Sequence, residues 1–280
     1  MASAAPALAA AVRPRWLTTP VVLGGLIAVF WISVALTVDW WPIHDAFLAT
    51  GGRLGPPDAT HWLGTDKLAR DVLSRTLHGA QYSLPIGLAV IASAVAIGAT
   101  LGAIAGFVGG LIDAAIMRLV DVTLSFPAIL LAMAVTASIG PGLRNATIAM
   151  IIVWWPNYAR LMRAQVLAVR EREHVEAAIA AGASAPRVLV RHILPLCWSP
   201  ILVNATMDFG QVVLQAASLS FIGLGASPPT PEWGQMISEG ARNFYQWWIA
   251  FGPGMAILSV ALGFNFLGDG LRDILDPRTQ

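Results

Sequence analysis

The chain carries a series of long apolar runs, and these limit its possible folds more than any other feature of the sequence. Each run approaches the roughly 20 residues that an α-helix needs to cross a bilayer. Hydrophobic residues make up 56% of the 280 positions and charged residues only 12%. A soluble protein of this size could not bury six such runs, so we predict an all-α integral membrane protein with six transmembrane helices. The predicted helices occupy residues 20–38, 83–109, 121–139, 145–159, 196–224 and 248–268.

The six runs also divide the chain into parts. No small-residue cleavage site follows the first run, so we expect it to remain as a membrane helix rather than to be removed as a signal peptide. The predicted parts are a cytoplasmic tail at 1–19, the first helix at 20–38, an external segment at 39–82, a core of five helices at 83–268 with a cytoplasmic loop at 160–195 and an external loop at 225–247, and a cytoplasmic tail at 269–280.

The distribution of Lys and Arg favours an orientation with both termini in the cytoplasm. With six crossings, eleven of the 17 basic residues then lie on the cytoplasmic side, as the positive-inside rule requires. The other basic residues lie outside, at Arg53, Lys67, Arg70, Arg75, Arg144 and Arg242.

The external segment at 39–82 is long enough to contain an amphipathic helix. Thr65 or Asp66 can cap its N-terminus, since both side chains can accept hydrogen bonds from backbone N–H groups. The apolar residues of this helix would then lie on the bilayer or on the protein and the charged ones would point outward. The apolar set is Leu68, Val72 and Leu73, and the charged set is Lys67, Arg70 and Asp71.

The charged stretch at 171–196 interrupts the apolar runs. Good helix formers predict a helix from Glu171 to Ala181, which Gly182 can end in a left-handed turn. Ser184 can cap a second helix, predicted from Arg187 to Leu194, and Pro195 would then return the chain to the membrane. Spacing alone leaves two interpretations open, namely a partner-binding helix and an amphipathic piece that lies on the lipid surface.

Two sets of residues within the apolar runs are candidate interaction sites. Gly98, Gly102, Gly106 and Gly110 recur at every fourth position and predict a face for close helix contact. Polar groups at membrane depth are costly, which makes those of the fifth helix functional candidates. They could line a pathway for a hydrated solute or could bond to neighbouring helices, and Asp208 could pair with an Arg of another helix. The polar set is Asp208, Gln211, Gln215 and Ser218.

The residues give no indication of a metal centre or an enzyme. Cys197 is the single cysteine, and the histidines, at 44, 61, 78, 174 and 192, lack the spacing of a metal-ligand set. The pattern G-x-x-x-x-G-K-[ST], which would hold the phosphates of ATP, does not occur. We therefore expect no catalytic residue, no metal and no cofactor in this chain.

The order of residues in the charged stretch resembles the EAA loop in permease subunits of binding-protein-dependent ABC importers. The match consists of Glu176-Ala177-Ala178, then Gly182 after three intervening residues, and Leu194-Pro195. In that family the loop forms a coupling helix that docks on a cytoplasmic ATPase. The resemblance assigns this role to Glu176, Ala177, Ala178, Gly182 and Ala183, with Val175 and Ile179 beside them. His192 stands where the family has Ile, which is shifted to position 193.

Further runs resemble the second, C-type permease of the dipeptide, oligopeptide and nickel importers. Ala69 replaces the Gly that is usual in the first of these runs. The runs are HWLGTDKLARDVLSR at 61–75, SFPAILLA at 125–132, LSFIGLG at 219–225 with PPTPEWG at 228–234, and LGDGLRD at 267–273 with Asp276-Pro277-Arg278.

The resemblance implies the partners and the location of the chain. It implies a heterodimer with a second permease, two ATPase subunits or domains that bind ATP and Mg²⁺, an external substrate-binding protein, and a place in the lipid bilayer of the cytoplasmic membrane of a prokaryote. Nucleic acid is not an expected partner. Peptide is the expected cargo, with nickel or another small solute as the alternative. An ion-coupled secondary transporter would need inverted repeats, which the sequence does not display.

Overall fold

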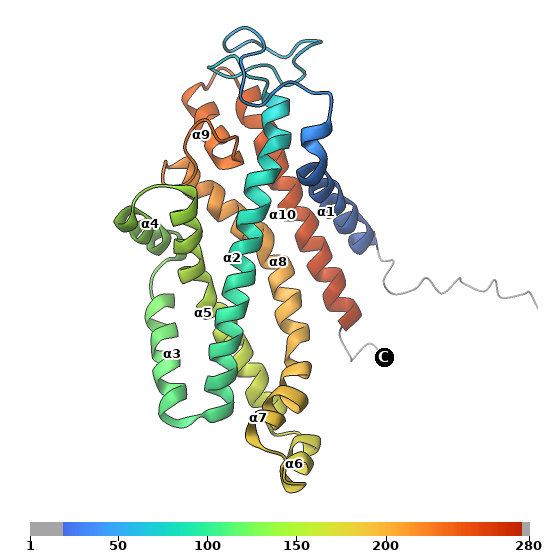
Figure 1. Ribbon diagram of the computed structural model, residues 1–280, viewed down its shortest axis with the longest axis vertical. Coiled ribbons are helices and arrows are strands. Elements are labelled where there is room, and N and C mark those ends of the chain that lie inside the picture. The colour runs from blue at the N-terminus through green and yellow to red at the C-terminus, as the bar shows by residue number, and fades with distance from the viewer. Residues whose placement is uncertain (1–18, 276–280) are drawn as a thin grey trace, which may run out of the picture.

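A computed structural model describes residues 19–275 of the chain as an elongated helical assembly (Figure 1). The predicted N-terminal tail up to residue 18 and residues 276–280 of the predicted C-terminal tail lie outside the described residues. The helices are α1 (Thr19–Thr37), α2 (Val72–Val108), α3 (Gly110–Leu124), α4 (Ala128–Ile139), α5 (Leu143–Arg170), α6 (Glu173–Ala180), α7 (Ala185–Val188), α8 (Leu194–Phe221), α9 (Trp233–Arg242) and α10 (Trp248–Leu275), with a 3₁₀ turn η2 (Val38–Trp40) and a π turn η3 (Leu189–Ile193).

Four helical stretches are long and apolar enough to cross a membrane. They contain the predicted helices at 20–38, at 83–109 and at 248–268, and most of the one at 196–224. The predicted helix at 145–159 lies inside α5, which does not reach the same hydropathy within the described residues because groups such as Asn157 and Arg160 interrupt it. The four stretches are Thr19–Trp40, Val72–Val108, Ala185–Phe221 and Trp248–Leu275.

The predicted helix at 121–139 is wrong as one continuous element. The chain bends by 91° between α3 and α4, and the two count as a fifth span only if the bent pair is taken together. Pro127 explains the break, because the residue before a proline is disfavoured in the α conformation. Apolar residues continue on both sides of the bend, so average hydropathy does not reveal it.

Two groups of packed helices form the body of the molecule. In the first, α2 lies against α5 along much of its length, and in the second, α10 packs against both α1 and α8. Trp31 of α1 donates a hydrogen bond from Nε1 to Ser259 Oγ of α10 at 2.8 Å. Phe209 of α8 stacks on Phe264 of α10 with ring centroids 4.1 Å apart. A hydrogen bond therefore joins α1 to α10, and an aromatic stack joins α8 to α10.

Residues 41–71 and 222–247, which we call the loop cap, cover one end of this body (Figure 1). The amphipathic helix predicted at 39–82 is wrong, because residues 41–71 contain no helix. Instead α2 begins at Val72, and its cap is Asp71, whose Oδ1 accepts a hydrogen bond from Ser74 N at 2.7 Å. Neither Thr65 nor Asp66 caps a helix.

Side chains within the loop cap also differ from the amphipathic prediction. Arg70 and Asp71 are buried although we expected them to point outward, while Leu68 is exposed. Ala69, which replaces the usual Gly of the resembling family, has φ of +62°. That left-handed conformation disfavours a side chain, so the glycine of the family pattern has a plain physical reason here.

At the opposite end of the molecule, α6 and α7 project beyond the other helices (Figure 1). The second helix predicted at 187–194 does not end at Pro195, because α7, η3 and α8 form one continuous helical stretch from Ala185 to Phe221. Pro195 lies in the first turn of α8 and cannot donate to the preceding turn. The wider π turn at Leu189–Ile193 directly precedes it, and π turns commonly take up such local irregularities. The C-terminal end of α10 points toward this same end (Figure 1).

Candidate functional site: a projecting helix and the interfaces behind it

The helix α6 is held at its base and exposed at its tip. Two residues separate it from the end of α5, and it packs against α5, α7 and η3. The backbone carbonyl of Arg172 accepts from the N–H groups of Val175 and Glu176, which closes the first turn. A short helix fixed in this way presents its outer residues in a constant orientation.

Gly182 turns the chain from α6 to α7. Its φ is +82°, and nothing lies within 4 Å of the position that a Cβ would occupy. The requirement for glycine is therefore conformational rather than spatial. Ala183 N donates to the carbonyl of Ala178, which completes the turn. Ser184 stands at the predicted cap position of α7 with extended backbone, but its side chain makes no capping hydrogen bond.

The residues of the predicted coupling set divide into an anchor and a surface. Val175 is buried in the main core, so it holds α6 to the bundle. Ile179, in contrast, is 57% exposed. Glu176 and Ala177 are exposed as well, and Ala178 is partly exposed. The tip of α6 thus offers one branched apolar side chain, one carboxylate and small neighbours that let another surface approach closely.

Asp208 of α8 bonds to α5. Tyr158 of α5, which is buried, donates from its hydroxyl to Asp208 Oδ2 at 2.8 Å. We considered an Arg of another helix as the partner of Asp208, but the partner is Tyr158. The bond satisfies a carboxylate that would otherwise be costly at this depth.

The other polar groups of α8 have two different environments. Gln215 accepts a hydrogen bond from Trp154 Nε1 of α5 at 3.1 Å, so that it also joins the two helices. Gln211 is exposed, and Ser218 donates to the carbonyl of Leu214 in its own helix. Helical spacing places Gln211, Leu214 and Ser218 on one stripe of α8. Of the predicted polar set, therefore, two members bind α5 and two share the stripe.

Three of the four predicted glycines lie directly against α5. A Cβ on Gly98, Gly102 or Gly106 would meet the backbone carbonyl of Trp155, Ala159 or Arg163, respectively. These carbonyls recur at the same four-residue spacing as the glycines, and the two helices therefore remain in register. Gly110 is not part of this face: its φ is +58°, no atom lies within 4 Å of its Cβ position, and it starts α3 after a turn.

A buried charged cluster joins the loop cap to the bundle, and we did not predict this cluster from the sequence. Arg70 contacts Asp66 at 2.6 Å and Glu239 of α9 at 3.7 Å. Arg75 of α2 contacts Asp66 at 3.4 Å and donates to the carbonyl of Ala46 at 2.9 Å. The four charged side chains are at most 4% exposed. The one available signal was the density of charges at 66–75 directly before an apolar helix.

The second part of the loop cap is anchored by Glu232. Its carboxylate accepts from the N–H groups of Gly234 and Gln235 at 3.0 and 2.9 Å and thereby caps α9. Burial raises the pKa of Glu232, and the backbone hydrogen bonds of Gly234 and Gln235 act in the opposite direction. Because this side chain is buried, it is not available to a partner protein, unlike the exposed Phe244, Tyr245 and Trp247.

The loop cap also brings together histidines that we expected to be scattered. His44 and His61 are 17 positions apart in sequence, yet their rings lie 4.7 Å apart, and Asp71 lies beside them. Among the described residues they form the group that could hold a metal ion. No spacing rule could have found this group, since a loop without regular structure brings the rings together.

Comparisons with known proteins agree on one family. Residues 98–280 match the family described as "Binding-protein-dependent transport system inner membrane component". The "Probable D,D-dipeptide transport system permease protein DdpC" of Escherichia coli (strain K12) is 45% identical over 260 residues, which cover 92% of this chain and 87% of that protein. The "Di/tripeptide transport system permease protein DppC" of Pseudomonas aeruginosa (strain UCBPP-PA14) is 43% identical over 268 residues, which cover 92% and 88%.

A solved structure supports the fold. One chain of "Inward facing conformations of the MetNI methionine ABC transporter" superposes with a TM-score of 0.60 at 20% identity, covering 72% of this chain and 97% of that chain. At this level of identity the likeness concerns the arrangement of the helices.

Proposed function

Because the chain belongs to the family of binding-protein-dependent transport system inner membrane components, we propose that it is the second permease subunit of an ATP-driven importer of small peptides. In this role it forms half of the translocation pathway across the cytoplasmic membrane of a prokaryote. The α3–α4 pair and α5 complete six transmembrane helices, and the end of the molecule that carries α6 faces the cytoplasm.

The observation that carries the proposal is the exposed tip of α6. Glu176 and Ile179 face solvent on a helix whose base is fixed by buried Val175. A branched apolar residue surrounded by alanines, with one carboxylate beside it, suits a groove on a partner protein. We assign this surface to the cytoplasmic ATPase. ATP and Mg²⁺ would be held by the ATPase, so that this chain needs no nucleotide site of its own.

The pathway itself is proposed to run along α8. Gln211 and Ser218 offer polar groups on the stripe of this helix, while Asp208 and Gln215 are occupied by α5. Exposed Leu214 and Phe221 on the same helix suit contact with the second permease. That second permease would supply the other half of the pathway. The external binding protein would approach the loop cap, at the end opposite α6.

Peptide is the favoured cargo because the relatives are named for dipeptides and for di- and tripeptides. The same machinery with nickel or another small solute is the second candidate. An ion-coupled secondary transporter is less favoured, because it leaves α6 without a role and Asp208 is bonded to Tyr158.

Uptake of labelled dialanine and of labelled nickel in the native host tests the proposal. The strains are the deletion and the deletion complemented with the wild-type, Glu176→Lys or Glu171→Lys gene, with the amount of protein in the membrane measured in each. Glu171→Lys is the matched control, since it makes the same charge change at an exposed residue just outside α6.

We expect dialanine uptake to be lost in the deletion and with Glu176→Lys, and to be retained with Glu171→Lys. Loss of nickel uptake alone would replace peptide by metal as the cargo. Normal dialanine and nickel uptake in the deletion would reject both cargoes. Wild-type uptake with Glu176→Lys would refute the role given to α6.

A further inference from the structure

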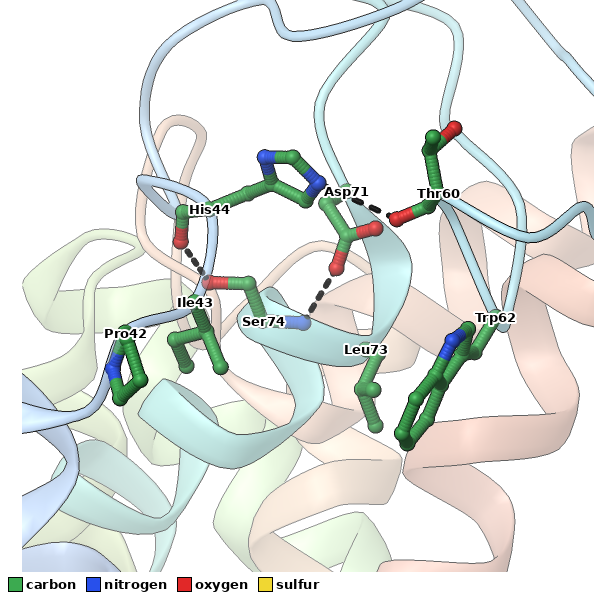
Figure 2. A pocket seen from close by; sticks show the side chains of 8 residues that line it. All are labelled: Pro42, Ile43, His44, Thr60, Trp62, Asp71, Leu73 and Ser74. Carbon is green, nitrogen blue, oxygen red and sulfur yellow. Dashed lines mark hydrogen bonds between the residues drawn. The ribbon is translucent and has the colours of Figure 1, made fainter.

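His44 and Asp71 line a cavity of about 400 Å³ in the loop cap (Figure 2), and His61 lies beside these two residues. His44 is exposed, whereas His61 and Asp71 are buried. One possible ligand atom from each residue lies within 4.8 Å of those of the other two. The site is therefore open to solvent on one side and lined by protein on the other, as a site that takes up an ion requires.

The hydrogen bonds within this group already place nitrogen and oxygen atoms close together. His61 Nδ1 lies 2.9 Å from Asp71 Oδ2, and His44 Nε2 lies 3.1 Å from the backbone carbonyl oxygen of Thr60. A cation bonded to tetrahedral ligands at about 2.0–2.1 Å holds them roughly 3.3 Å apart. Both pairs are near this separation, and a rotation of the exposed His44 ring can bring the two pairs together.

The His61–Asp71 bond alone could be a structural contact of the loop, but it gives no reason for the position of His44. The backbone of His44 is fixed, because its carbonyl accepts a hydrogen bond from Ser74 Oγ of α2 (Figure 2). Asp71 is fixed as well, since its Oδ1 accepts from Ser74 N. Ser74 of α2 thus holds the backbone of His44 and the carboxylate of Asp71. The bond to the carboxylate is an outer hydrogen bond of the kind that is typical of metal ligands.

Charge and donor type indicate the class of cation. Asp71 contributes a carboxylate at the N-terminus of α2 and offsets the partial positive charge of that helix end. Two imidazole nitrogens, one carboxylate oxygen and one carbonyl oxygen suit a borderline divalent transition metal. Mg²⁺ and Ca²⁺ prefer sites made of oxygen alone.

We propose that His44, His61 and Asp71 form a binding site for a divalent transition-metal cation, with Zn²⁺ as the expected ion and the Thr60 carbonyl as a fourth ligand. When bound, the ion ties residues 44 and 60–61 of the loop cap to the start of α2. Each imidazole offers an unprotonated nitrogen, and its ring proton is carried on the other nitrogen. The site is independent of the transport role and of the identity of the cargo.

Zn²⁺ binding to the purified protein tests this site. The full chain is prepared in detergent with the subunits that co-purify, carries an affinity tag without histidine, and is stripped of metal before titration. The proteins compared are wild type, His44→Ala, His44→Cys and His174→Ala. His174 is the matched control, since it is an exposed histidine of α6 at the opposite end of the molecule.

Wild type is expected to bind one Zn²⁺ per chain at this site. His44→Ala is expected to bind this ion with an affinity at least about tenfold weaker. Zn²⁺, but not Mg²⁺, should raise the melting temperature of wild type and of His174→Ala, because a ligand that binds only the folded state stabilises it. With Co²⁺ as the probe, His44→Cys should add a thiolate-to-metal charge-transfer band that wild type lacks.

Equal Zn²⁺ affinity in wild type and His44→Ala would overturn the proposal, as would a wild type that binds no Zn²⁺. The same holds if Co²⁺ gives no thiolate band with His44→Cys, because residue 44 is then not a ligand. The cysteine variant decides the matter even if His44→Ala folds poorly, since Cys can itself bind the metal at position 44.

Discussion

At the scale of single residues, the hydrogen bond between Tyr158 and Asp208 lends itself to a direct test. Tyr158→Phe removes one oxygen atom and leaves the carboxylate without its partner in the α5–α8 interface. A buried acceptor that loses its donor costs about 1–3 kcal/mol. We therefore expect a lower apparent melting temperature in detergent, measured by loss of native fluorescence or by aggregation.

The control for this change is Tyr245→Phe, which removes the same atom from a side chain that is 88% exposed. It should leave the melting temperature unchanged. If both variants have the melting temperature of wild type, the hydrogen bond from Tyr158 to Asp208 does not contribute to the stability of the protein.

The polar residues of α8 show what a sequence can and cannot indicate at this scale. The cost of polar groups in a membrane selected Asp208 and Gln215 as candidates, but it left open whether they line a pathway or bond to neighbouring helices. It could not identify Tyr158 and Trp154 as those partners, because helix register depends on packing between elements far apart in the chain. Trp and Tyr within apolar runs are too common to indicate a bond.

At the scale of elements, the contact between α2 and α5 depends on glycine. Gly102→Ala would drive a methyl group into the carbonyl of Ala159, and because that obstacle is backbone, one of the two helices must shift. Overpacking of this kind costs about 1–3 kcal/mol. We expect a clear drop in melting temperature and weaker dialanine uptake at equal protein level.

Gly254→Ala in α10 is the matched control, since its Cβ position has no atom within 4 Å and its backbone is helical. Alanine favours helix more than glycine does, so this variant should be neutral or slightly more stable. Equal destabilisation by both changes would mean that helix glycines matter here for a reason other than close approach.

Hydropathy predicted the helices that are apolar throughout, and it failed where local stereochemistry decides. The bend at 125–127 follows from Pro127, which the apolar average of 121–139 conceals. Pro195 misled the prediction in the other direction, because a π turn lets the helix continue past it. A proline in an apolar run therefore marks a place where the helix can break, without showing whether it does.

At the scale of the whole molecule, buried charges attach the loop cap to the helices. Asp66→Asn keeps the oxygen that accepts from Leu68 N and Arg70 N but removes the charge shared by Arg70 and Arg75. Loss of one partner from a buried ion pair costs about 3–5 kcal/mol. We expect protease to cut within residues 41–71 much faster in this variant, while α2 and α5 remain protected.

Asp121→Asn provides the comparison, because its ion pair with Arg160 joins side chains that are 61% and 57% exposed. Exposed pairs contribute about 0–1 kcal/mol, so proteolysis should proceed as in wild type. If Asp66→Asn is as resistant as Asp121→Asn, the loop cap is held by its apolar contacts and not by the buried cluster.

The loop cap is also where the sequence was least informative. Its residues read as a charged amphipathic helix, because composition cannot distinguish a charge that faces water from one that is paired inside. The turn at Gly182 could be predicted from the sequence, because the left-handed conformation of a glycine is a local feature. The coupling role of residues 175–183 rests on a family resemblance and stays a prediction. The sequence failed to predict contacts where distant segments come together.

One consequence follows from the way in which the two ends of the molecule are joined. After a gap of two residues α6 continues from α5, α5 rests on the glycines of α2, and α2 starts inside the loop cap (Figure 1). These connections form a continuous path of packed helices from α6 to the loop cap. A push on the tip of α6 must then tilt the loop cap as part of the same body, and bending is left to the elbow between α3 and α4.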